Sequence, residues 1–168
     1  MKRLVYVSRP CEGLSDKAVE QIILFATKHN YSRHISGCLI YDKNIFVQYL
    51  EGKGSDVDYL LERIQMDSRH SDLRVIYSDY VYNKARLFKN WSMMYQRNGQ
   101  LKRVNKALSQ KLEHLKSNLN GSDYTDTTDK EIIGLMISLA ENHGLSPGDL
   151  GSDLPSDQGP LKCHWIEI

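Results

Sequence analysis

The feature that most constrains this chain is the alternation, in its N-terminal part, of short apolar runs with amphipathic stretches. Residues 3–8, RLVYVS, form a β-branched and aromatic run that predicts a strand. Ser15 precedes a stretch with apolar residues at helical spacing and is its expected N-cap. Two further runs, 36–41 and 45–50, flank the turn residues DKN and predict a hairpin. The chain therefore begins with a strand, a helix and a hairpin.

A second amphipathic stretch and two more strand-like runs complete this pattern. Ser55 is the expected N-cap of the second helix, which should end near Asp67. The segments LRVIYSDYV and WSMMYQ predict two further strands. An antiparallel sheet with both helices on one face, the ferredoxin-like α+β plan, satisfies this order with short right-handed connections.

The remainder of the 168-residue chain differs from this region in composition. We expect one domain over residues 1–100, an extension of two helices over 101–145, and a loop-rich tail over 146–168. The extension carries weaker helical patterns interrupted by the polar segment NGSDYTDTTD, and the tail is rich in Gly, Ser, Asp and Pro.

Charge and cysteine content argue against several classes of protein. The chain has 22 Lys and Arg against 21 Asp and Glu, so no general attraction to nucleic acid or anionic lipid is expected. No apolar run approaches the roughly 20 residues of a membrane span, and a signal-peptide core is lacking, which predicts a cytoplasmic protein. Cys11, Cys38 and Cys163 are widely spaced, so neither a disulfide framework nor a metal site is expected.

Polar side chains within the predicted strands point to a binding groove. Tyr6 and Gln48 are costly to bury unless their polar atoms are paired, although a core tyrosine and a solvent-facing glutamine are the plainer interpretation. Asn30 has an equally plain explanation as a left-handed helix terminator. Taken with Arg63 and Asp67, these residues would ring a groove between two apolar helices that suits a flat aromatic ligand with polar edges. The Gly-rich phosphate loop of a dinucleotide fold is lacking.

Five separated motifs, LVYVS, KHNYSRHISGCLIY, FVQYLEG, ERIQMDSRH and FKNWSMMY, resemble those of the BLUF family of blue-light sensors. The resemblance implies a ferredoxin-like domain that binds FAD, or FMN or riboflavin, without a covalent bond and between its two helices. In such a domain Ile22 and Ile64 would clamp the ring, Asn30 would bond its pyrimidine edge, and Arg63 would reach a ring carbonyl. The remaining implied flavin contacts are Tyr6, His29, Gln48, Asp67, Arg69 and His70.

The same resemblance implies a light-driven switch and no catalytic activity. Excited flavin would take an electron and a proton from Tyr6, and the charge would return after the amide of Gln48 had rotated or tautomerised. Trp91 and Met93 resemble the switching residues of the last strand, one of which would move toward the flavin as Gln48 changes; which of the two is inward in the dark stays open. An unidentified downstream protein, or a second copy of the chain, would then read it through the last strand and the helical extension.

Three alternative functions stay open at the level of sequence. They are a flavin-binding scaffold without photochemistry, a small acylphosphatase-like enzyme on the same fold, and a binder of single-stranded RNA. The near-neutral charge disfavours the RNA binder, and the first loop, SRPCEGLS, offers no obvious phosphate cradle for the enzyme.

Overall fold

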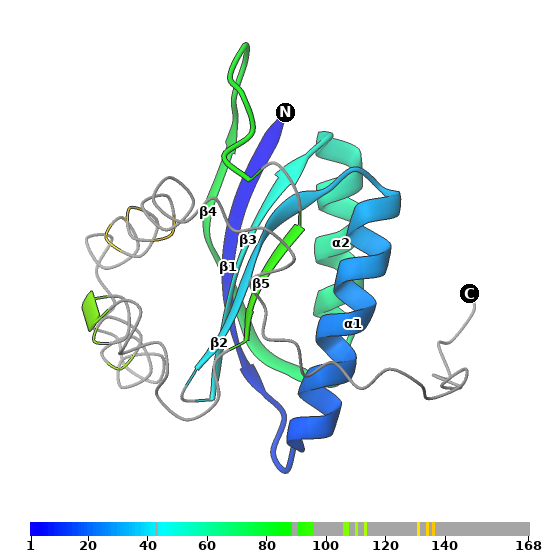
Figure 1. The fold of residues 1–168 in the computed structure, drawn as a ribbon, viewed down its shortest axis with the longest axis vertical. Coiled ribbons are helices and arrows are strands. Elements are labelled where there is room, and N and C mark those ends of the chain that lie inside the picture. The colour runs from blue at the N-terminus through cyan, green and yellow to red at the C-terminus, as the bar shows by residue number, and fades with distance from the viewer. Residues whose placement is uncertain are drawn as a thin grey trace.

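The computed structural model describes residues 1–42, 44–88 and 91–95, together with positions 106, 107, 110, 113, 131, 134 and 136. Its elements alternate as the sequence predicts (Figure 1). In chain order they are β1 (Lys2–Pro10), α1 (Asp16–Ser32), β2 (Ser36–Asp42), β3 (Ile45–Gly52), α2 (Gly54–Gln65), β4 (His70–Tyr80) and β5 (Trp91–Tyr95).

The strands form one sheet in the order β4-β1-β3-β2-β5. The first four pair antiparallel, which confirms the ferredoxin-like α+β plan. The fifth differs from the all-antiparallel expectation, because β5 runs parallel to β2. Its direction follows from the connection: β4 ends where Tyr80 faces Lys2, and β5 begins where Trp91 faces Gly37, at the same end of the sheet. Because the chain leaves β4 and enters β5 at the same end of the sheet, β5 must run opposite to β4.

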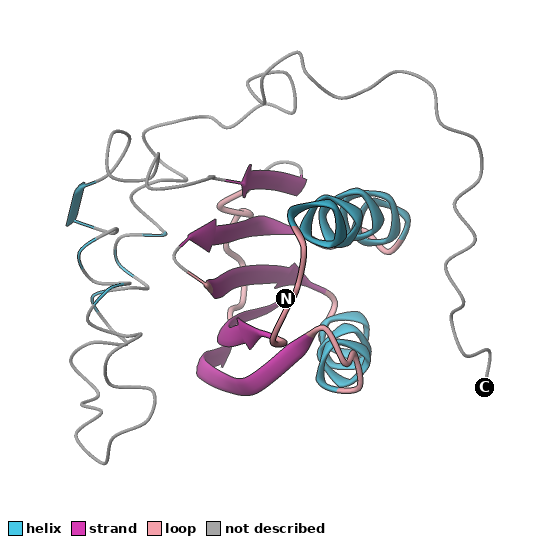
Figure 2. Cartoon of the chain, turned by 90° about the horizontal axis from the view of Figure 1, so that it is seen from below, coloured by secondary structure: helices cyan, strands magenta, loops and turns pink. Residues whose placement is uncertain are grey.

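Both helices cover one face of this sheet (Figure 2). The apolar cluster between the two layers includes Val19 and Val57 of the helices, which are fully buried, and it adjoins the buried polar residues Tyr6, Asn30 and Gln48. Strand side chains alternate between faces, so Phe46 and Leu50 point toward the helices and into the same cluster. The two layers therefore bury a continuous core on the side where the predicted groove lies.

The two helices begin in different ways. The Ser15 side chain accepts a hydrogen bond from the Ala18 amide at 3.2 Å, which confirms the predicted N-cap of α1. The prediction for Ser55 was wrong, because α2 begins at Gly54, two residues earlier than an N-cap at Ser55 implies, and Lys53 occupies the N-cap without a side-chain bond. A Cβ at Gly54 would lie 2.5 Å from the Tyr80 hydroxyl, so glycine allows the first turn of α2 to pack closely against the end of β4.

Most of the predicted extension and the whole predicted tail lie outside the described residues. The seven described positions after β5 are helical, and Met136 among them is buried. The division into two helices over 101–145 and a tail over 146–168 stays a prediction. Within the described residues, no helix is both long and apolar enough to cross a membrane.

Removing the two serine hydroxyls should separate the true cap from the false one. Ser15→Ala should lower the free energy of unfolding by about 1 kcal/mol, because one N-terminal amide of α1 loses its partner. Ser55→Ala is the matched control and should change it by less than about 0.5 kcal/mol. Urea unfolding measures both values, and equal losses would contradict the assignment.

Candidate functional site

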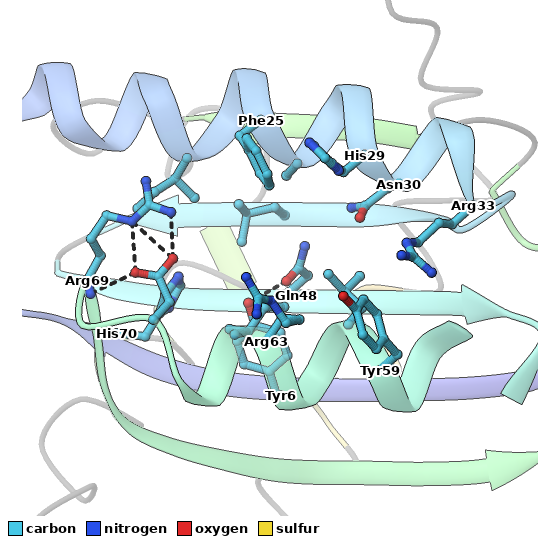
Figure 3. A pocket seen from close by; sticks show the side chains of 16 residues that line it. Tyr6, Phe25, His29, Asn30, Arg33, Gln48, Tyr59, Arg63, Arg69 and His70 are labelled. Carbon is cyan, nitrogen blue, oxygen red and sulfur yellow. Dashed lines mark hydrogen bonds and ion pairs between the residues drawn. The ribbon is translucent and has the colours of Figure 1, made fainter. Parts of the chain in front are cut away.

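A cavity of about 370 Å³ lies between α1 and α2 over the strands of the sheet (Figure 3). Every residue that the sequence predicted as a cofactor contact lines it. These are Tyr6, Ile22, His29, Asn30, Gln48, Arg63, Ile64, Asp67, Arg69 and His70. Side chains that are distant in sequence and come from both helices and three strands thus share one space.

Tyr6 and Gln48 form the polar floor of this cavity. They are direct partners in the antiparallel register of β1 and β3, so their side chains stand next to each other on the same face. The Tyr6 hydroxyl donates a hydrogen bond to Oε1 of Gln48. Both residues are buried, which rules out the solvent-facing interpretation of Gln48. Burial, with the nearby negative charge of Asp67, raises the pKa of Tyr6, so its hydroxyl keeps its proton at neutral pH.

Asn30 presents two unpaired polar atoms to the cavity. Its residue is only 1% exposed, yet neither Nδ2 nor Oδ1 has a hydrogen-bond partner. The alternative that Asn30 terminates the helix in a left-handed conformation is wrong, because α1 continues to Ser32 and His34 takes the positive φ of 53°. A buried amide without partners costs about 1–3 kcal/mol per group, so this geometry calls for a ligand with one acceptor and one donor.

A second polar group occupies the other end of the cavity. The Asp67 carboxylate accepts bonds from the backbone amide and from Nε of Arg69, both at 2.9 Å. Burial acts to raise the pKa of Asp67, but these bonds from Arg69 outweigh it and hold the pKa below its ordinary value. Ser8 Oγ lies 2.8 Å from Nδ1 of His70. Burial, opposed by Asp67 and aided by Arg69, lowers the pKa of His70 to about 4, so its ring is neutral at pH 7.

The sequence analysis missed six lining residues, namely Phe25, Ala26, Arg33, Leu39, Tyr59 and Leu60. The Arg33 guanidinium stacks 4.4 Å from the ring centre of Tyr59, between α1 and α2. Phe25 stacks on His29 with ring centres 3.8 Å apart. Helical spacing could have found some of them, because the lining positions of α1 recur every three or four residues from Ile22 to Arg33.

Comparison with known proteins decides the family. A family model for sensors of blue light using FAD, named BLUF, matches residues 1–94. The chain belongs to the BLUF family. BLUF domains bind FAD, so flavin is the cofactor of this fold, and the domain is a blue-light sensor domain.

Solved structures and curated relatives agree with this assignment. BlsA in its ground state is 28% identical with a TM-score of 0.60, over 81% of this chain and 87% of that one. BlrB, a BLUF protein in its dark state, is 29% identical with a TM-score of 0.59, over 82% and 96%. Photoactivated adenylate cyclase subunit beta of Euglena gracilis is 34% identical over 74 residues. That match takes in 44% of this chain and only 9% of the cyclase subunit.

The residues of this BLUF chain fit a flavin. The pyrimidine edge of an isoalloxazine ring carries an N–H between two carbonyl oxygens, which complements the two unpaired atoms of Asn30. Aliphatic side chains line the same cavity from both helices, Ile22 from α1 and Ile64 from α2, and suit the flat faces of the ring. The individual contacts stay predictions.

Two residues predicted to take part in the switch, Trp91 and Met93, are described only in their backbones. Trp91 and Met93 lie in β5, where their backbones pair with Gly37 and Leu39, while their side chains lie outside the described residues. Among the described residues no group of three or more His, Cys, Asp or Glu is placed to hold a metal ion.

The depressed pKa of His70 predicts a specific loss of stability in acid. The unfolded chain binds a proton near pH 6.5, whereas the folded protein binds it only near pH 4. The free energy of unfolding should therefore fall by up to roughly 3 kcal/mol as pH drops across this window, because each pH unit between the two values contributes about 1.36 kcal/mol. His70→Asn should flatten that slope. His34→Asn, at an exposed position with a φ that Asn tolerates, should leave it unchanged; equal slopes in all three proteins would contradict the assignment.

Proposed function

We propose that this protein is a blue-light receptor in which Tyr6, Gln48 and a bound flavin exchange two hydrogen-bond patterns. The observation that carries the proposal is the buried bond from the Tyr6 hydroxyl to Oε1 of Gln48 on the cavity floor. An amide has an acceptor end and a donor end. In the pattern observed here the acceptor end faces Tyr6, which leaves Nε2 as the end available to a ligand. Reversal of the amide exchanges these two ends.

Because Tyr6 and Gln48 are buried, reversal of the Gln48 amide has a large effect on the hydrogen bonds of the flavin. In a low-dielectric site a hydrogen bond to a ring is stronger than in water, and losing it is correspondingly costly. Gln48 is 2% exposed and Tyr6 is 1% exposed, so water does not compete for their polar atoms. Each amide orientation therefore gives the flavin a distinct set of hydrogen-bond partners. When a ring carbonyl accepts a stronger hydrogen bond, the absorption of the flavin moves slightly to the red.

Tyr6 supplies the reacting proton in this scheme. A bound flavin supplies the absorption of blue light and an excited state that accepts an electron. The raised pKa of Tyr6 keeps its proton on the hydroxyl in the dark, held toward Oε1 of Gln48. When Tyr6 gives up its electron the phenol becomes strongly acidic, and its proton would pass to Oε1 of Gln48 while the Gln48 amide nitrogen gives a proton to the flavin. The electron and the proton would return to Tyr6 after the amide has rotated or tautomerised.

The other lining residues hold and orient the ring. Asn30 bonds the pyrimidine edge, Arg63 reaches a ring carbonyl, and His29 lies at the ring edge, where it stacks on Phe25. The Asp67 and Arg69 pair lies with His70 at the far end of the cavity, on the ribityl and phosphate side. FAD fits this arrangement, and FMN or riboflavin would share the same ring contacts.

The output passes to a protein partner through β5 and the helical extension, and the receptor catalyses no reaction itself. Light shifts the balance between two arrangements of the last strand, and a partner that prefers one of them reads the difference. A second copy of this chain is an alternative partner. In this scheme Trp91 and Met93, in the strand beside β2, carry the change.

Two substitutions on the cavity floor test the switch. The purified protein should be yellow, and blue light should move its flavin absorption reversibly to the red. Gln48→Leu should keep the colour and lose the shift, because leucine offers neither amide end. Tyr6→Phe should also bind flavin without switching, since only the hydroxyl is removed. Absorption spectra before and after illumination decide the matter, and a normal shift in either variant would refute these roles. A colourless protein that takes up no added flavin would refute the proposal as a whole.

Asn30 tests the binding mode separately. Asn30→Leu should weaken flavin binding by roughly 10- to 100-fold, because two hydrogen bonds of about 0.5–1.5 kcal/mol each are lost. Thr27→Val, at an exposed position one turn earlier on α1, is the control and should bind normally. Fluorescence titration of the flavin-depleted protein measures both affinities. Equal affinities in the two variants would remove Asn30 from the binding site.

A further inference from the structure

The face of the sheet opposite the cavity carries a buried carboxylate. Glu51 follows Gln48 by three positions in β3, so the two side chains point to opposite faces of the sheet. Glu51 is fully buried. A buried carboxylate is retained only where several donors satisfy it, so its partners show what it holds in place.

Two of those partners belong to the connection between β4 and β5. Oε1 of Glu51 accepts the backbone amide of Phe88 at 2.7 Å, and Oε2 accepts that of Leu87 at 3.1 Å. The hydroxyls of Ser36 and Tyr49 donate to the same two oxygens, each at 3.2 Å. Both carboxylate oxygens thus join the sheet to a segment that enters β5 three residues after Phe88.

Two arginines strengthen this attachment. Arg3 lies 3.5 Å from Oε2 of Glu51 and donates to the Ala85 carbonyl at 2.8 Å. Arg86 donates to Oγ of Ser36 at 2.8 Å and to the Glu51 carbonyl at 3.0 Å. The ring of Phe88 packs 5.3 Å from that of Tyr49. Residues 85–88 are therefore bound to β1, β2 and β3 together.

The register shows what this attachment positions. Arg3, Glu51 and Ser36 are Cα partners in one row across β1, β3 and β2. A second row across the sheet runs Tyr6, Gln48, Leu39 and, in β5, Met93. Because β5 pairs with β2 alone at the edge of the sheet, its register depends on where the preceding segment is anchored.

We propose that Glu51 is a positioning residue for the light signal: by holding residues 87–88 on the far face, it sets the register of β5 that brings Met93 into the row of Gln48. The inference rests on the proposed function. A change of the Gln48 amide can reach β5 through the backbone bonds of that row only while β5 stays in this register. If the bonds from Glu51 to residues 87–88 are lost, β5 can shift along β2. Met93 then no longer stays in the row of Gln48, and the change at Gln48 is not passed to β5.

Glu51→Gln in the flavin-loaded full chain is the decisive variant. Gln has one acceptor oxygen, so one of the two amides of residues 87 and 88 must lose its bond. The yellow colour and the red shift should persist, because the cavity is untouched. In the dark, amide exchange of Leu87 or Phe88 should be roughly tenfold faster, as expected for a lost bond to a charged acceptor. The light-minus-dark difference in amide exchange over residues 91–95 should fall to less than about half of that in the unmodified protein.

Matched variants separate positioning from general destabilisation. Glu62→Gln makes the same substitution at an exposed position of α2 and should leave all readouts unchanged. Amides of β1 and β3 serve as the internal reference for global stability. Arg86→Met loosens the same attachment without altering the buried carboxylate, and it should give the same pattern more weakly if Glu51→Gln fails to fold.

The outcomes distinguish this inference from the proposed function. Absence of any red shift in the unmodified protein would overturn the proposed function and the inference with it. A normal red shift with a full light-minus-dark difference over 91–95 in Glu51→Gln would overturn the inference alone. The inference would be overturned equally by unchanged exchange of both Leu87 and Phe88 in that variant, or by an unmodified protein that shifts to the red without any light-dependent exchange in β5.

Discussion

The antiparallel pairing of β1 with β3 is the constraint on which the rest of this site depends. It places Tyr6 opposite Gln48, and the alternation of a strand turns both side chains toward the helices. A slip of one residue would turn the side chains of the shifted strand to the opposite face, so Tyr6 and Gln48 would no longer meet and that strand would lose its core contacts with the helices. The apolar burial of Leu4, Phe46 and Leu50 on the same face makes such a slip costly, so core packing and the polar floor enforce one register.

Strand β3 has two roles because its two faces differ. Phe46, Gln48 and Leu50 face the helices, while Tyr49 and Glu51 face the other way and hold the connection to β5. All eight residues of β3 are buried, so neither face is left to solvent. A central strand with polar groups buried on both sides must satisfy each of them. On one face the connection to β5 satisfies Glu51, and on the other Gln48 accepts the bond from Tyr6 at the floor of the cavity.

The sequence predicted the elements well because their determinants are local. The hairpin is predicted by DKN, and Asn44 indeed takes the left-handed φ of 62° that a tight turn requires. Predictions failed where a contact between residues distant in sequence determines where an element begins or in which direction it runs. Ser55 resembles a cap, but Tyr80 fixes the start of α2 at Gly54. His70 follows the end of α2 closely in sequence, yet it opens β4 because Pro10 pairs with it. The parallel direction of β5 depends on its starting at the end of the sheet where β4 finishes, and its connection is held by Glu51, 40 positions before Trp91, so no local pattern predicts it.

The residues of the candidate site likewise divide into those that the sequence predicted and those that only the structure reveals. The resemblance to BLUF domains supplied its polar members, whereas the contact of Arg33 with Tyr59 becomes visible only when α1 and α2 lie side by side. What the structure adds is the state of the polar atoms before a ligand binds. The side chains of Tyr6, Asp67 and His70 already have partners, and the side-chain amide of Asn30 has none. In the proposed binding mode flavin satisfies a buried amide that is otherwise a net cost to folding, and the folded state gains stability by RT ln(1 + [L]/Kd). That binding mode links cofactor retention and fold stability through one side chain of α1.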